Sequence, residues 1–245
     1  MIDNMTPTVK QLLIINVIFF LGSFAVPQAE NLLALHYFEN PSFKFWQPLT
    51  HMFMHGGIMH IAFNMFALIS FGSILEHMWG SKKFLFFYFS CGFGSAIVHS
   101  GMNYVYVHNG LETLIANGFN ITDVLKVLSE GKYDSNWQEF LSTSQFTNLI
   151  SSYATPAVGA SGAIYGLMVA FAFVMPNAEL SLMFIPVPIK AKFFVPGFIF
   201  LYDIIFGIFG SGSNVAHFAH IGGALFGFLI MWMWKKNSFD NKRWD

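Results

Sequence analysis

Long apolar runs recur from one end of the chain to the other, and they limit its fold more than any other feature. A helix needs about 20 apolar residues to cross roughly 30 Å of hydrocarbon at about 1.5 Å per residue. Lipid offers the backbone no hydrogen-bond partner, so each run is expected to be a helix. The sequence predicts an all-α, polytopic membrane protein with six transmembrane helices, at residues 11–29, 56–76, 84–107, 153–175, 193–210 and 214–234.

The scarcity of charge supports this class. Only 10% of the 245 residues are charged and 55% are hydrophobic, whereas a soluble domain carries about 25% charged residues. The net charge of −1 favours neither nucleic acid nor an acidic partner. The single cysteine, Cys91, excludes an intramolecular disulfide. We therefore expect a protein surrounded by membrane lipid, with no nucleic-acid partner.

The distribution of Lys and Arg predicts the orientation. With the N-terminus inside, nine of the 12 basic residues face the cytoplasm, and only Lys44, Lys126 and Lys132 face outside. The opposite orientation reverses this ratio. We predict cytoplasmic N- and C-termini, a first span that is kept as a signal anchor, and, from the compact six-span layout, a bacterial inner (plasma) membrane.

One polar segment, residues 108–152, separates the third and fourth spans and lies outside in this orientation. Its pieces Leu111–Ala116 and Ile121–Leu128 are predicted to be short amphipathic helices. The segment is too long for a plain connector, so it covers the active site, handles substrate, or is a variable insertion. We treat residues 1–245 as a single six-span domain with this insertion. The stretch Leu180–Ile189 is short and broken by prolines, which indicates an interfacial segment.

Polar side chains at bilayer depth are costly, so each is a functional candidate. They fall on three of the predicted spans: His60 and Asn64 on the second, Ser161 on the fourth, and His217 and His220 on the sixth. These spans run in the same direction. Asn64, Ser161 and His220 each lie a similar number of residues into their spans, which predicts one common depth, about 10 Å below the outer surface.

This set of side chains suits acyl transfer. A Ser hydroxyl needs a base that takes its proton, and His220 is the candidate base for Ser161. His60 and Asn64 share one helix face and are candidate donors to an oxyanion, together with the Ser161 N–H. Asp203 is the available acid within a span, but no partner for it is evident. The sequence therefore predicts a Ser–His dyad.

Small residues surround the candidate nucleophile in the run Gly159-Ala160-Ser161-Gly162, and glycines let helix backbones approach closely. Tyr165 follows one turn later and is expected to lie against the His220 ring. Taken singly, both features are also common at helix interfaces without function. Residues Phe209–Asn214 contain a Gly-Ser run, which is expected to be flexible. We expect this loop or the fifth span to control access to the site.

The order of these motifs resembles that of the rhomboid family of intramembrane serine proteases. The resemblance covers about residues 45–235. It rests on Gly159-Ala160-Ser161-Gly162, Ala219-His220-Ile221-Gly222-Gly223, Gly223-x-x-x-Gly227, His55, His60-Ile-Ala-Phe-Asn64 and Gly72-x-x-x-Glu76-x-x-x-Gly80. Where the family usually has Trp-Arg in the first loop, this chain has Trp46-Gln47, which puts in doubt any role assigned to a guanidinium there.

The resemblance implies a rhomboid-like bundle in which Ser161 is the nucleophile and His220 its general base. It implies that His60 and Asn64 assist the oxyanion, that Tyr165 packs beside His220, and that Gly159 supports the site. The implied substrates are single-span membrane proteins, cut in or near the outer half of the bilayer. The implied chemistry uses no metal and no cofactor. Glu76 is expected to bond backbone groups of a loop or a helix end.

Three other functions are alternatives to a serine endopeptidase. A catalytically inactive rhomboid-like protein that binds membrane clients is expected to lack the Ser or the His, and this chain has both. A haem or metal protein is permitted by the spacing of the pairs His51/His55 and His217/His220. A transporter would carry charged groups along a midplane path or inverted repeats, and neither is evident. His217 is an alternative base, although the His-x-Gly-Gly context favours His220.

Overall fold

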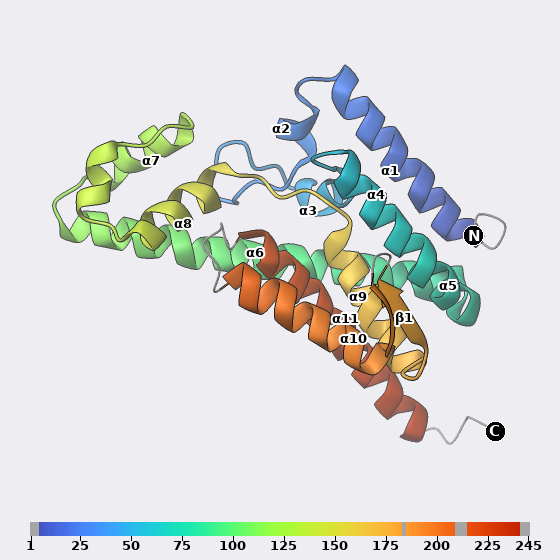
Figure 1. Ribbon diagram of the computed structural model, residues 1–245. Helices are drawn as coiled ribbons and strands as arrows, with labels where there is room; N and C mark the ends of the chain where they lie inside the picture. The colour runs from blue at the N-terminus through green and yellow to red at the C-terminus, as the bar shows by residue number, and fades with distance from the viewer. Residues whose placement is uncertain (1–4, 183–184, 209–214, 241–245) are drawn as a thin grey trace.

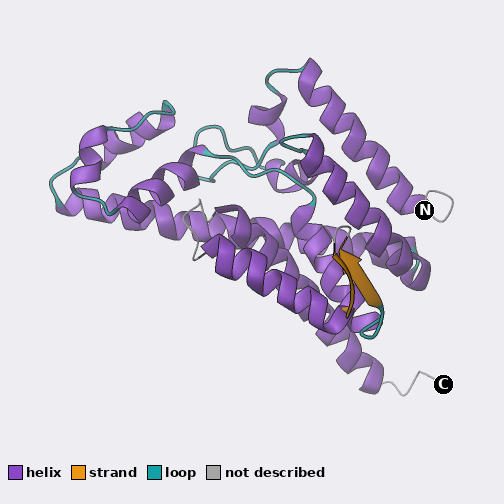
Figure 2. Cartoon of the chain, viewed as in Figure 1, coloured by secondary structure: helices purple, strands orange, loops and turns teal. Residues whose placement is uncertain are grey.

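The computed structural model describes residues 5–182, 185–208 and 215–240, and helices make up most of this part of the chain (Figure 2). The predicted loop Phe209–Asn214 lies outside the described residues. Four described helices are long and apolar enough to cross a membrane, and the six-span prediction is consistent with them once two shorter helical segments, Ser161–Val174 and residues 191–208, are added. The four are Pro7–Ala25, Ile58–Trp79, Ser81–Ala116 and His217–Lys236.

The first helix, α1 (Pro7–Ala25), is followed by α2 (Ala29–Leu33), α3 (Gln47–Thr50) and the 3-10 turn η2 (His51–Phe53). The second span comprises α4 (Ile58–Ala67), the π-helical η3 (Leu68–Gly72) and α5 (Ser73–Trp79).

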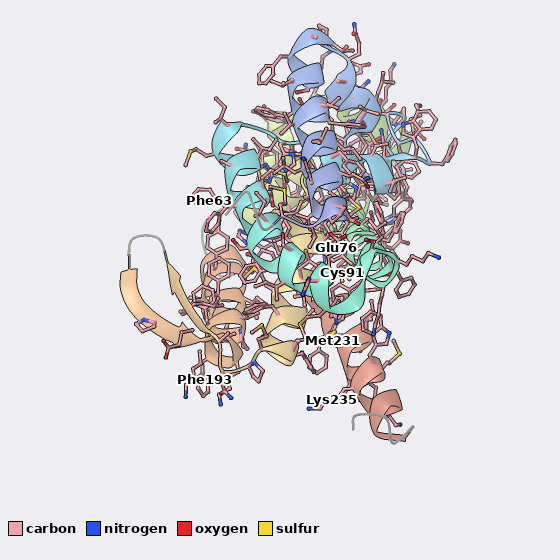
Figure 3. All side chains as sticks on the ribbon, turned by 90° about the vertical axis from the view of Figure 1, so that its right-hand side faces the viewer. Phe63, Glu76, Cys91, Phe193, Met231 and Lys235 are labelled. Atoms are coloured by element: carbon pink, nitrogen blue, oxygen red, sulfur yellow. The ribbon has the colours of Figure 1, made fainter. Side chains whose placement is uncertain are left out.

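The second span anchors the first through one buried carboxylate. Glu76 accepts hydrogen bonds from the backbone N–H groups of Thr8 (3.1 Å) and Val9 (3.0 Å) and from the Thr6 and Ser81 hydroxyls. These N–H groups are the unpaired donors of the first turn of α1. The prediction that Glu76 bonds backbone groups at a helix end is confirmed, and Figure 3 labels it among the helices.

Helix α6 (Ser81–Ala116) runs across the whole molecule (Figure 1). It extends past the predicted limit of residue 107, and the predicted separate helix Leu111–Ala116 is wrong because these residues are its last turns. No proline interrupts α6, which ends where Gly118 adopts a φ of +90°.

The rest of the insertion packs on the distal end of α6. Helix α7 (Ile121–Ser129) agrees with the predicted piece Ile121–Leu128, and it is followed by the 3-10 turn η4 (Ser135–Glu139) and by α8 (Thr143–Ala154). Leu114 of α6, Leu128, Trp137 and Leu149 are buried together in a core of their own. The insertion is therefore packed around a second apolar cluster, to which Tyr37 of the first loop also contributes.

At the centre of the bundle, α9 (Ser161–Val174) and α11 (Val215–Asp240) lie against α6 and against each other. Two pairs of glycines bring their backbones into contact. A Cβ at Gly223 would overlap the carbonyl of Gly162, and a Cβ at Gly227 would lie 2.7 Å from the Gly166 Cα. Small residues of this kind let membrane helices approach without intervening side chains.

Between these two helices the chain forms a hairpin and a further helix. Strands β1 (Glu179–Leu182) and β2 (Ile185–Lys190) pair antiparallel over much of the stretch Leu180–Ile189. They are followed by α10 (Ala191–Phe198), which contains Pro196, and by the π-helical η5 (Ile199–Ile208). Phe63 of α4 and Phe193 of α10 point away from the bundle and are exposed, as expected for side chains that face lipid (Figure 3).

Two further predicted span limits are wrong. The first span is α1, four residues earlier than the predicted 11–29, and the fourth is not a continuous helix over 153–175. Pro156 disfavours helical geometry at the preceding residue, and Gly159 has a φ of +126°, so residues 155–160 are not helical. Ser161 is therefore the first residue of α9, not a residue about eight positions into a helix, and the depth estimate built on that position does not hold.

The contact between α9 and α11 predicts a large effect of one methyl group. We expect Gly223→Ala to lower the free energy of unfolding by about 1–3 kcal/mol or more, because its Cβ meets backbone that has no rotamer to change. Gly197→Ala on α10 is the matched control, since nothing lies within 4 Å of its Cβ position. Thermal unfolding in detergent measures both variants. Equal melting temperatures for the two would contradict the packing described here.

Candidate active site

The segment that leads into Ser161 is held by the loop between the first two spans. Leu35 and Ala157 exchange backbone hydrogen bonds of 2.9 and 2.8 Å, and the Gly159 N–H donates to the His51 carbonyl at 2.9 Å. Burial lowers the pKa of His51 to about 4, so its ring is neutral at neutral pH, and its Nδ1 lies 3.0 Å from the Gln47 carbonyl. The first loop therefore fixes where α9 begins.

Gln47 ties that loop together from inside. Its side chain is fully buried, its Oε1 accepts from the His36 N–H at 3.3 Å, and its Nε2 donates to the carbonyls of Asn31 (3.2 Å) and Ser42 (3.0 Å). An amide supplies both donors and an acceptor. At the position where the family resemblance implies an arginine, the neutral side chain of Gln47 thus bonds three backbone groups.

Ser161 and His220 are brought into direct contact by the close crossing of α9 and α11. The His220 Nε2 lies 2.9 Å from the Ser161 Oγ. The Tyr165 ring stacks on the His220 imidazole, with centroids 4.3 Å apart and planes inclined by 13°. Because α9 begins at Ser161 without a side-chain cap, its first backbone N–H groups have no partner within the helix and the positive end of its dipole lies at the hydroxyl.

His60 lies on the other side of Gly159. A Cβ at Gly159 would come within 2.8 Å of the His60 Nε2. The Nδ1 of His60 accepts from the Gly56 N–H at 3.4 Å, which leaves the ring proton on Nε2, the atom that faces the Ser161 segment. Asn64 is buried, but its amide donates to the carbonyl of His60 at 3.1 Å. The structure thus brings His60 to the site, whereas the Asn64 amide bonds its own helix.

Asp203 has partners after all, so the statement that none is evident was wrong. Its buried carboxylate Oδ1 lies 2.8 Å from the Nδ1 of His220 and 2.9 Å from the Nδ1 of His217. The Tyr165 hydroxyl also interacts electrostatically with this carboxylate. The second oxygen, Oδ2, accepts no hydrogen bond from the described part of the chain. The predicted dyad therefore lies in a chain of three groups, Asp203, His220 and Ser161.

The two histidines of α11 take different places. His220 connects Asp203 to Ser161, whereas His217 makes its polar contact, within the described part of the chain, with Asp203. Of the two candidate bases, the geometry therefore favours His220. Among the described residues, Asp203, His217 and His220 are the group whose ligand atoms lie close enough, within 4.8 Å of one another, to hold a metal ion.

Comparisons with known proteins identify the family. The family profile described as the rhomboid domain matches residues 42–120 and 139–237, which together make up well over half of the chain. The chain belongs to the rhomboid family. Residues 121–138, which separate the two matched ranges, contain α7 and the start of η4, so the family pattern resumes within the insertion.

Three relatives illustrate the similarity. An uncharacterized mitochondrial rhomboid protein of Schizosaccharomyces pombe is 29% identical over 80% of this chain and 53% of its own. The rhomboid protease GluP of Bacillus subtilis is 28% identical over 76% of this chain and 25% of its own. The mitochondrial presenilin-associated rhomboid-like protein of Homo sapiens is 25% identical over 90% of this chain and 46% of its own. The chain thus spans from a quarter to about half of these relatives.

The family and the apolar spans establish an integral membrane protein with a rhomboid-type helical fold. Several of the relatives are named as mitochondrial proteins. The comparisons therefore do not support the bacterial inner membrane predicted from the layout of the spans.

Gly159 offers a test of the site's geometry. We expect Gly159→Ala to slow labelling of Ser161 by a fluorophosphonate about 100-fold, because the new Cβ displaces the His60 ring and an oxyanion donor is worth that much. Gly118→Ala is the matched control, since Gly118 also has a positive φ but nothing within 4 Å of its Cβ position. Labelling of Gly159→Ala at the rate of Gly118→Ala would contradict the position given to His60 beside the reactive hydroxyl.

Proposed function

We propose that this protein is an intramembrane serine endopeptidase that cuts transmembrane proteins in or near their membrane-spanning segments. The single observation that carries the proposal is the 2.9 Å contact between the Ser161 Oγ and the His220 Nε2. A hydroxyl hydrogen-bonded to an imidazole lone pair is the arrangement that activates a serine nucleophile. The relative named as a rhomboid protease gives further support.

In the proposed first step, the Ser161 Oγ attacks the carbonyl carbon of the scissile peptide while its proton passes to the His220 Nε2. The tetrahedral intermediate carries a negative oxygen, which the Ser161 N–H and the His60 Nε2–H stabilise. Asn64 adds a third donor after its amide turns away from the His60 carbonyl. The protonated His220 then gives its proton to the leaving amine as the peptide bond breaks.

Water completes the reaction. His220, neutral again, takes a proton from a water molecule that attacks the acyl-enzyme ester. The second tetrahedral intermediate collapses to release the new carboxyl group and to return the proton to Ser161. Every proton moves between groups already on the site, so the proposed reaction uses no metal and no cofactor. The substrates are transmembrane proteins, and membrane lipid is the other partner.

The domain and the orientation belong to the same proposal. Residues 1–245 form one membrane domain in which α7, η4 and α8 make up the outside insertion. Both termini lie on the side that holds nine of the 12 basic residues, the cytoplasmic side in the orientation given above. Ser161 and His220 then lie toward the opposite, outer face, where water has the shortest path to them.

The rival function is a catalytically inactive rhomboid-like protein that binds membrane clients. It shares the fold and the lipid environment with the proposed endopeptidase. What stands against it is the complete chain of contacts from Asp203 through His220 to Ser161, because a client-binding surface has no use for an activated serine.

Cleavage of a generic single-span substrate in liposomes tests the proposal. We expect Ser161→Ala to abolish both cleavage and fluorophosphonate labelling, and His220→Ala to lower kcat by about 10³-fold or more, because the hydroxyl loses its base. Ser70→Ala, which removes an exposed hydroxyl on η3 that bonds its own helix, is the control for serine loss. Wild-type protein that neither cleaves nor labels would favour the inactive client binder instead.

A further inference from the structure

The carboxylate of Asp203 is buried on an otherwise apolar helix, and a buried charge is retained only with partners. Its side chain is 0% exposed, and the two neighbours within ion-pair distance are His217 and His220. Both contacts are made by Nδ1 atoms to one oxygen, Oδ1. A carboxylate accepts hydrogen bonds only, so each imidazole carries its proton on Nδ1.

This fixes the tautomer of the general base. With its proton on Nδ1, His220 has a free lone pair on Nε2, and that atom faces the Ser161 hydroxyl at 2.9 Å. When the proton of Ser161 arrives on Nε2, the ring becomes a cation 2.8 Å from a carboxylate oxygen. The Asp203 charge thus stabilises the ring in the state that forms during reaction, in surroundings of low dielectric constant where charge pairs are strong.

The backbone that carries Asp203 has an unusual geometry. Asp203 lies in η5, a π-helical segment of ten residues that follows the proline-containing α10. π-Helical turns are rare and are frequently found at functional sites. Each such turn holds one more residue than an α-turn, so it changes which side chains face α11. The π-helical geometry of η5 and the two Nδ1 contacts are independent observations, and both concern Asp203.

We propose that Asp203 is a positioning residue for the reaction, holding His220 in its productive tautomer and orientation, and that His217 holds Asp203 as its second donor. The inference rests on the proposed serine endopeptidase and adds a third group to its Ser–His pair. Asp203 acts through His220, because His220 is the residue that contacts the Ser161 hydroxyl.

The main test compares Asp203→Asn with Leu201→Ala in liposomes on one single-span substrate. Asparagine keeps the shape of the side chain but loses the charge, and its amide can stabilise the wrong tautomer. We expect kcat to fall about 100-fold or more while KM stays within about threefold, by analogy with the loss of a triad carboxylate elsewhere. Leu201 lies two residues away on η5 and is exposed, so Leu201→Ala should keep wild-type kcat.

The pH profile separates positioning from a merely structural role. Without the carboxylate the imidazolium loses its partner, so the acidic limb of kcat against pH should move to lower pH in Asp203→Asn. The groups that face His220 are Ser161, Tyr165, Asp203, His217 and His60. Asp203→Asn leaves the other four in place. A structural role would lower the melting temperature and the folded yield without moving this limb.

Several outcomes would overturn the inference. One is an Asp203→Asn variant with kcat within about threefold of wild type and an unmoved profile, while Ser161→Ala is inactive; the endopeptidase then stands without its third group. Cleavage that survives Ser161→Ala removes the proposed function itself. Wild-type protein that retains one equivalent of zinc and changes activity when the zinc is removed would instead assign the three side chains to a metal.

A second variant keeps the test decisive if Asp203→Asn gives no folded protein. Labelling of Ser161 is then measured in His217→Ala, normalised to the folded fraction from size exclusion. We expect a rate about tenfold lower, because the carboxylate loses one of two donors but keeps His220. A labelling rate and pH profile equal to wild type in this variant would overturn the role given to the Asp203–His217 pair.

Discussion

The direct backbone contact between α9 and α11 is the constraint on which the site depends. Gly162 and Gly166 face Gly223 and Gly227 at a separation that leaves no room for a Cβ. Ser161 directly precedes the first of these glycines, and His220 lies three residues before Gly223. The spacing that lets the backbones touch therefore also sets the 2.9 Å between the hydroxyl and the imidazole. Because this contact involves main-chain atoms, side-chain motion cannot relax it, and the two reactive groups stay in register.

Three buried polar side chains play the complementary part, and each bonds specific partners. Glu76 bonds the first turn of α1, Gln47 bonds three backbone groups of the first loop, and Asp203 bonds two imidazoles. In hydrocarbon an unpaired polar group costs several kcal/mol, so these bonds hold segments that apolar packing alone would leave free to slide. Two of the three bond backbone groups, and only Asp203 bonds a side chain that acts in the proposed reaction, His220.

The sequence predicted much of this arrangement, for physical reasons that also explain its failures. Apolar run lengths and the order of the polar side chains located the helices of Ser161, His220 and His60. They failed where local backbone geometry decides: Pro156 and Gly159 delay the start of α9, and the absence of a proline lets α6 continue to Ala116. Hydropathy does not depend on backbone dihedral angles, so it cannot locate a residue with a positive φ. It also cannot show that a helix continues from an apolar span into a polar segment.

Asp203 could be recognised as an unusual residue, but its partner could not be named. In an α-helix each residue turns by about 100°, and a face predicted on that basis misses the side chains that a π-helical segment presents. The sequence between Asp203 and His217 also includes the run Gly210-Ser-Gly-Ser213, which carries no helical periodicity from which a shared face could be predicted. The signal that was available is the cost of an ionisable side chain at bilayer depth, which should have required a partner on a neighbouring span.

The packing around η5 explains why the Asp203 carboxylate is important for the position of this segment. An apolar groove of about 790 Å³ lies between α9, α10 with η5, and α11, lined by side chains such as Val169, Val195, Ile199, Ile204 and Leu225. Along this groove η5 lies less closely against its neighbours than α9 and α11 lie against each other, where backbone touches backbone. Dispersion falls off steeply with separation, so apolar contact contributes less to the seat of η5 than to the rest of the bundle. The two hydrogen bonds from His217 and His220 to Asp203 then restrain η5 where apolar packing contributes little. The orientation of the His220 ring on α11 therefore depends on the position of η5.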